Sequence, residues 1–128
     1  MLKRIYLSAA LIWTCSILFL CLASFSNLPD VGVKNADKYV HFTFHFVFVN
    51  LWFLYFNYKK QKSSTKLALF IFISSVIFGV LIELAQRVFT TTRKADFLDI
   101  LSNVIGAFSA LTLLLIYYFA IKWKSKSQ

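Results

Sequence analysis

The chain has 128 residues, which leaves room for a single domain. Hydrophobic residues make up 59% of it, against about 45–50% in soluble domains, and only three glycines and one proline interrupt the chain. The net charge of +9 comes from short basic clusters between long apolar runs, not from one basic face. This composition excludes a soluble globular fold, a β-rich fold and a nucleic-acid-binding protein, and it is typical of membrane proteins.

A membrane-spanning helix needs about 20 mostly apolar residues. In chain order, the stretches that meet this requirement are residues 5–25, 39–57, 67–89 and 98–121. The second stretch is the least lipid-like, because it is rich in aromatic residues and contains both histidines. The sequence therefore predicts an all-α fold, a polytopic bundle of four transmembrane helices that forms one domain over residues 1–128.

The first stretch follows two basic residues, Lys3 and Arg4. A cleaved signal peptide also has basic residues before an apolar core. Its apolar core is about 20 residues long, however, whereas the core of a signal peptide is about 7–15 residues. The small residues near its end, Ala23 and Ser24, make a weak cleavage site. We therefore expect the first helix to be retained.

The distribution of basic residues predicts the orientation of the helices. With four spans, the two chain ends and the loop 58–66 share one side of the membrane. Nine of the 14 basic residues lie in these segments, with no acidic residue among them, while the other five are mixed with aspartates on the opposite side. Because short cytoplasmic loops are rich in lysine and arginine, both termini are predicted to be cytoplasmic.

Polar residues are concentrated in or beside the last three spans. Asp37, His41 and His45 follow an i, i+4, i+8 spacing, so they share one face of the second span. The third span carries Glu83, Gln86 and Arg87, and the fourth carries Asp99, Asn103, Gly106 and Ala110, preceded by Arg93 and Asp96.

The depth of these residues follows from the helical rise of about 1.5 Å per residue. His45 lies about 12 Å along from Asp37, and Asn103 lies about 6 Å past Asp99. Glu83 lies about 9 Å before the end of its span. All three sets start from the ends that face away from the cytoplasm and reach similar depths, so we expect them to form one outward-facing polar pocket.

Structural roles are the alternative for the same residues. Glu83 and Arg87 have the i, i+4 spacing of a pair that neutralises itself, and Asp37 and Asp99 could cap their helices. Asn103 and the Gly106-x-x-x-Ala110 spacing are typical of close helix packing in membranes. A functional site is favoured, because an acid as deep as Glu83 is costly unless a cavity or a partner receives it.

Three segments carry a family resemblance. Residues 37–42 read DKYVHF, residues 82–86 read IELAQ and residues 93–106 read RKADFLDILSNVIG. In order and spacing they resemble the D-K-x-x-H-F, E-x-x-Q and R-x-x-D-x-x-D-x-x-x-N-x-x-G segments of VanZ-like membrane proteins. The resemblance covers roughly residues 30–112. It implies a transmembrane bundle in the bacterial cytoplasmic membrane. It also implies an association with resistance to teicoplanin, a glycopeptide that acts on cell-wall precursors outside the membrane.

These observations favour a protein that binds or modifies a lipid or lipid-linked envelope component at the outer leaflet. An intramembrane acid–base or metal-dependent enzyme, with His41 as the general base or acid, is an alternative, and so is an accessory subunit of a larger membrane protein. A proton pathway is disfavoured, because the cytoplasmic halves of the spans are nearly all apolar.

The predicted site residues fall into three groups. Candidate catalytic residues are Asp37, His41, Glu83 and Asp99; candidate ligand-binding residues are Lys38, Gln86, Arg87, Arg93, Asp96 and Asn103; structural residues are Gly106 and Ala110. His41, His45, Glu83 and Asp99 could alternatively bind a metal. An H-x-x-x-H pair without a following glutamate motif is a weak metal signal, however, so no metal or cofactor is predicted. The expected partners are membrane lipids or a lipid-linked precursor, and another membrane protein or a second copy of the chain, with no nucleic acid.

Overall fold

A computed structural model describes residues 1–23, 35–58, 65–89 and 96–124 of the protein. The described residues form four α-helices: α1 (Leu2–Leu22), α2 (Ala36–Asn57), α3 (Thr65–Phe89) and α4 (Phe97–Lys124). Each helix is long and apolar enough to cross a membrane, for which about 20 residues are needed. The predicted all-α bundle of four helices is therefore confirmed, and the chain is a multi-pass membrane protein.

Several helix boundaries differ from the predicted spans by a few residues. α1 and α2 each begin three residues before the predicted start, and α4 continues to Lys124. α2 begins directly after Asn35, whose backbone is left-handed (φ 61°), a conformation that asparagine tolerates. Lys122 and Lys124 lie in the last turn of α4, where positive charge is favourable. Hydropathy alone does not identify these helix ends, because each helix continues beyond its apolar residues into the membrane–water interface. The predicted end of the first span, Phe25, lies outside the described residues.

The helix N-termini correct one predicted alternative. Asp96 precedes α4, and its side-chain Oδ1 accepts a hydrogen bond from the backbone N–H of Leu98 at 2.9 Å. Asn35 occupies the corresponding position before α2, and Asp37 lies inside the first turn. The interpretation of Asp37 and Asp99 as helix caps is therefore wrong, which leaves both carboxylates available for tertiary contacts.

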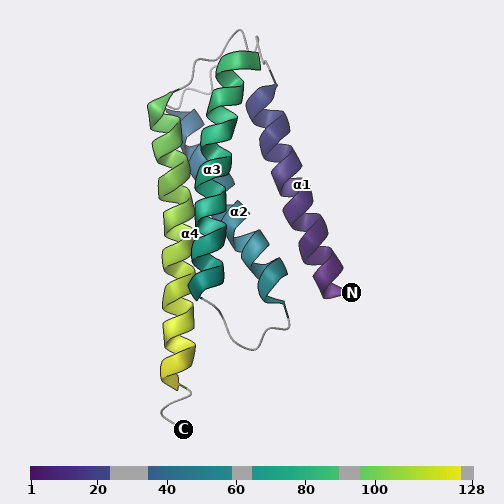
Figure 1. Ribbon diagram of the computed structural model, residues 1–128, viewed down its shortest axis with the longest axis vertical. Helices are drawn as coiled ribbons and strands as arrows, with labels where there is room; N and C mark the ends of the chain where they lie inside the picture. Colours follow the sequence, from purple (N-terminus) through teal and green to yellow (C-terminus); the bar gives the residue numbers. More distant parts are fainter. Residues whose placement is uncertain (24–34, 59–64, 90–95, 125–128) are drawn as a thin grey trace.

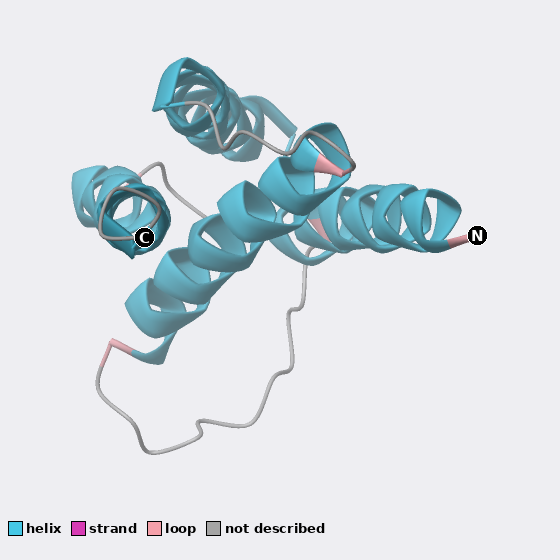
Figure 2. Ribbon diagram, turned by 90° about the horizontal axis from the view of Figure 1, so that it is seen from below, coloured by secondary structure: helices cyan, strands magenta, loops and turns pink. Residues whose placement is uncertain are grey.

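The helices alternate in direction, so the two chain termini lie at the same end of the bundle (Figure 1). Figure 2 shows α2 crossing the bundle obliquely between the other helices. It contacts α1, α3 and α4, whereas the described parts of α1 and α4 do not touch each other. α2 is thus the central helix, and side chains that it buries can meet partners from the whole bundle.

The backbones of α2 and α4 approach each other closely at Gly106. A Cβ atom on Gly106 would lie 2.1 Å from the carbonyl oxygen of Phe42, far inside van der Waals contact. Further along the same contact face, Ala107 and Ala110 are fully buried. Small residues allow such close packing of membrane helices, and here Gly106 is the residue at which no side chain fits.

Hydrogen bonds attach α1 to the side of this core. The indole N–H of Trp13 donates to the carbonyl oxygen of Phe44 at 3.0 Å, and that of Trp52 donates to the hydroxyl of Thr14 at 3.2 Å. Among the described residues, large apolar side chains such as Phe70, Ile77 and Phe108 point outwards. The bundle therefore has an apolar surface that suits lipid.

Replacing Gly106 with alanine is expected to destabilise the bundle by about 1–3 kcal/mol or more, because the added methyl group overpacks a backbone–backbone contact. Gly79→Ala is expected to cost less, because there the added Cβ meets side chains at 3.0 Å, which can move slightly. Thermal unfolding of both variants in detergent measures this difference. Ser109→Ala, on the exposed side of α4, is the matched control. Equal midpoints for Gly106→Ala and Ser109→Ala would contradict the crossing described above.

Candidate functional site

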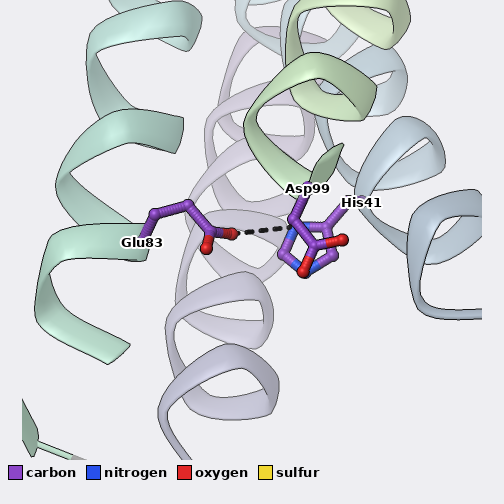
Figure 3. Close-up of side chains that lie close together, drawn as sticks. All are labelled: His41, Glu83 and Asp99. Carbon is purple, nitrogen blue, oxygen red and sulfur yellow. Dashed lines mark ion pairs between the residues drawn. The ribbon is translucent and has the colours of Figure 1, made fainter. Parts of the chain in front are cut away.

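Buried polar side chains from three helices meet in the half of the bundle that lies away from the termini. His41 comes from α2, Glu83 from α3, and Asp99 and Asn103 from α4, and all four residues are buried. Figure 3 shows the carboxylates of Glu83 and Asp99 turned towards the imidazole ring of His41. Side chains distant in the sequence are thus brought together around a central histidine, and three of the four candidate catalytic residues are among them. Their catalytic role stays a prediction.

The imidazole ring of His41 contacts all three of its polar neighbours. Its Nδ1 lies 3.1 Å from Oδ1 of Asn103, which is a hydrogen-bond distance, and 3.7 Å from Oε1 of Glu83. On the other side of the ring, Nε2 lies 3.9 Å from Oδ2 of Asp99. Because the Asn103 oxygen can only accept a hydrogen bond, Nδ1 is the donor in this pair.

Lys38 connects a second group of acids at the outer edge of the site. Its ammonium nitrogen lies 2.9 Å from Asp37 and from Asp96, and 3.0 Å from Oδ1 of Asp99. An ammonium group has three N–H donors, so these three carboxylates use all of them. Asp37 is the fourth candidate catalytic residue, and it belongs to this outer group.

Asp99 belongs to both groups. One of its carboxylate oxygens pairs with Lys38, and the other faces His41. Its side chain is 12% exposed, between the buried His41 and the more exposed Asp96. The two groups therefore form one continuous polar site, which we call the α2–α4 polar site: Asp37, Lys38, His41, Glu83, Asp96, Asp99 and Asn103.

A further polar pair lies deeper in the bundle, below the α2–α4 polar site. Nδ1 of His45 lies 2.9 Å from the hydroxyl of Ser75, and both residues are essentially fully buried. Gly79 lies between this pair and the site, since a Cβ there would touch both His45 and Asn103 at 3.0 Å. The sequence predicts His45 on the same helix face as His41 and offers it as an alternative metal ligand, but in the structure it pairs with Ser75.

The remaining predicted site residues do not join the α2–α4 polar site. Gln86 is buried, but its amide donates to the carbonyl oxygen of Cys21 at 2.9 Å and so attaches α3 to α1. Arg87 is exposed at the end of α3, and Arg93 lies outside the described residues. Their predicted role in ligand binding stays a prediction. Gly106 and Ala110 lie at the α2–α4 contact, below the site.

Comparisons with known proteins add no relative: no protein-family model, no curated protein and no solved structure matches the chain. The resemblance to VanZ-like proteins therefore rests on the three motif segments alone.

Lys38 also governs how the outer acids bind protons. The hydrogen bond from its ammonium group, together with that from the N–H of Leu98, holds the pKa of the Asp96 carboxyl below its ordinary value. A carboxyl whose pKa is lower in the folded than in the unfolded chain stabilises the fold at pH values above about 4, and this contribution is lost as the pH falls further.

Lys38→Met is expected to lower the unfolding midpoint at pH 7, because three carboxylates then face one another without their cation. The difference from wild type is expected to narrow as the pH falls from 7 to about 3, because protonation removes the repulsion. Thermal unfolding in detergent at several pH values tests this. Lys66→Met is the control, because Lys66 is exposed near the N-terminus of α3, at the end of the bundle away from the α2–α4 polar site. A deficit that stays constant over this pH range would show that Lys38 acts through packing and not through charge.

Proposed function

We propose that this protein is a VanZ-like membrane protein that binds the polar head of a lipid or lipid-linked envelope component at the α2–α4 polar site. The observation that carries the proposal is the convergence of His41, Glu83 and Asp99 from three helices at one end of the bundle. Burying several ionisable groups among membrane helices is costly, and such groups are usually retained for function.

The position of the site suits an amphiphilic ligand. Asp37 and Asp96 are 54% and 41% exposed at the outer edge, where headgroups lie, while His41 and Glu83 are deep. Beside His41, the surface of α2 has a shallow apolar groove lined by Tyr39, Val40, Thr43 and Phe44. In the proposed complex, an acyl or prenyl chain lies in this groove and the polar head reaches the carboxylates.

The proposed orientation places the α2–α4 polar site on the outer side of the membrane. Both termini lie at the opposite end of the bundle (Figure 1), and nine of the 14 basic residues belong to the segments on that side. Such segments are typically cytoplasmic. An outward site agrees with the family association with teicoplanin, since that drug acts on precursors outside the membrane.

The orientation is tested with reporter fusions in bacterial cells. A fluorescent protein fused after Gln128 is expected to be fluorescent, because that reporter folds in the cytoplasm. Alkaline phosphatase, which is active only outside, is expected to be inactive after Gln128 and active when fused after Phe89. The reverse pattern would place the α2–α4 polar site in the cytoplasm and rule out the proposed ligands of the outer leaflet.

Ligand binding is tested by titrating the purified chain in detergent with phosphatidylglycerol and with a polyprenyl diphosphate. Wild type is expected to bind one of them saturably. For phosphatidylglycerol, whose glycerol hydroxyls can donate to a carboxylate, Asp99→Asn is expected to weaken binding about tenfold or more, since a hydrogen bond to a charged group contributes about 1.5–3 kcal/mol. Ser102→Ala is the matched control on the same helix, where the hydroxyl bonds to the carbonyl of Leu98. If neither lipid binds saturably, or if Asp99→Asn binds as wild type does, the proposal is wrong.

A second candidate function is acid–base catalysis. It is favoured by the position of His41, which has a carboxylate near each ring nitrogen and could accept and donate a proton. The same titration distinguishes the two functions when the lipid is analysed by mass spectrometry afterwards. A lipid recovered unchanged supports binding, whereas a product of different mass supports catalysis.

A further inference from the structure

The three residues at the centre of the site have the composition and spacing of a metal site. His41, Glu83 and Asp99 each offer one nitrogen or oxygen ligand atom, and these atoms lie within 4.8 Å of one another. Ligands that share one zinc ion at about 2.0–2.2 Å lie about 3–4 Å apart. The 3.9 Å between Nε2 of His41 and Oδ2 of Asp99 is already in this range.

An ion fits on the side of the His41 ring that faces Asp99. Nδ1 is the ring nitrogen that hydrogen-bonds to Asn103, so Nε2 is the one left for a metal ion, and it lies 3.9 Å from Oδ2 of Asp99. This distance is too long for a hydrogen bond, but two ligands of one ion can be this far apart. His41 and Asp99 are both buried, so the two ligand atoms lie in a site of low polarity.

We propose that His41, Glu83 and Asp99 bind a divalent first-row transition-metal ion, such as Zn²⁺ or Mn²⁺. Imidazole nitrogen favours such ions over Ca²⁺ and Mg²⁺, which prefer oxygen ligands alone. The two charges of the ion balance the two carboxylates. Glu83 has a flexible side chain on α3, which reaches the ion by rotation about its side-chain bonds.

The neighbouring side chains hold the ligands in the way that outer-shell residues do in metal sites. Asn103 accepts a hydrogen bond from Nδ1 of His41 and so orients the ring, and Lys38 holds the oxygen of Asp99 that does not face His41. In metal proteins, the ligating histidine usually donates its second N–H to such a partner. Two of the three ligands are thus oriented in advance.

The neighbouring acidic group, Asp37, Asp96 and Asp99, also has metal-ligand spacing. Its centre, however, is already filled by the ammonium group of Lys38, which lies within 3.0 Å of all three carboxylates. A metal ion there would have to displace a lysine that neutralises the acids. The His41 group is therefore the one that the geometry assigns to the metal.

The test uses the full chain in detergent, treated with a chelator and then dialysed against Zn²⁺ or Mn²⁺ alone. We expect about one ion per chain, measured by plasma mass spectrometry. Asp99→Asn and His41→Gln are each expected to weaken binding by at least about 10–100-fold, the loss found when even an outer-shell partner is removed. Ser109→Ala is the control on α4, because its hydroxyl bonds within its own helix. Size-exclusion chromatography checks that every variant is folded.

A second measurement does not depend on the variants. Wild type loaded with Co²⁺ is expected to show visible absorption bands of a site with nitrogen and oxygen ligands, and added Zn²⁺ is expected to remove them. Folded wild type that binds no ion, or variants that bind as tightly as wild type, would overturn the proposal.

A bound ion has a consequence that rests on the proposed function. A dication adds positive charge to a site otherwise rich in carboxylates, so the metal-loaded chain is expected to bind phosphatidylglycerol more tightly than the chelator-treated chain. Because metal binding is measured without lipid, the two proposals fail separately. Metal uptake without any lipid binding would leave the metal site standing and remove the headgroup function.

Discussion

The close crossing of α2 and α4 is the contact on which both the packing and the α2–α4 polar site depend. The helices meet where the carbonyl group of Phe42 lies against Gly106, and no side chain fits between them. His41 immediately precedes Phe42, while Asp99 and Asn103 lie seven and three residues before Gly106, on the same face of α4. The spacing that brings the backbones together therefore also presses His41 against Asn103 and brings it within reach of Asp99. In this bundle the site is an extension of the helix crossing, and a change in one alters the other.

Polarity is graded along the axis of the bundle, and this gradation makes the buried charges tolerable. At the outer edge, Asp37 and Asp96 keep about half of their side-chain surface exposed and share the ammonium group of Lys38. Asp99 connects them to His41 and Glu83, which are buried. A charge near the end of a membrane helix costs less than one at its centre. Asp37 and Asp96 thus lie where water can still solvate their charges. The charge of the deeper Glu83 is one that a bound cation would balance.

The sequence predicted the elements of this protein well and their contacts less well. Long apolar runs identify the helices to within about three residues, and helical periodicity places His41, Glu83 and Asp99 at similar depths. Periodicity describes one helix at a time, however, and the decisive contacts join distant segments: Lys38 and Asp99 are 61 residues apart in the chain, and Gln86 and Cys21 are 65 apart. Gln86 has the same polar pattern as the site residues, yet it bonds to the α1 backbone. Nothing in the sequence of α3 distinguishes a polar residue that belongs to the site from one that bonds to a neighbouring helix. The capping role of Asp96 was missed for a similar reason, because Asp96 and Asp99 are equally plausible caps until the backbone is seen.

The depth at which buried polarity ends limits what the protein can do. Among the described residues, His45 and Ser75 are the deepest buried polar pair, and from there towards the termini the core consists of apolar residues such as Val49, Phe53, Ile71 and Leu111. A path for protons or ions would need polar groups or water through this part of the bundle. In the described residues, buried polar side chains are thus confined to the half of the bundle away from the termini, and the other half has an apolar core. This division agrees with the proposed binding of a ligand at one membrane surface.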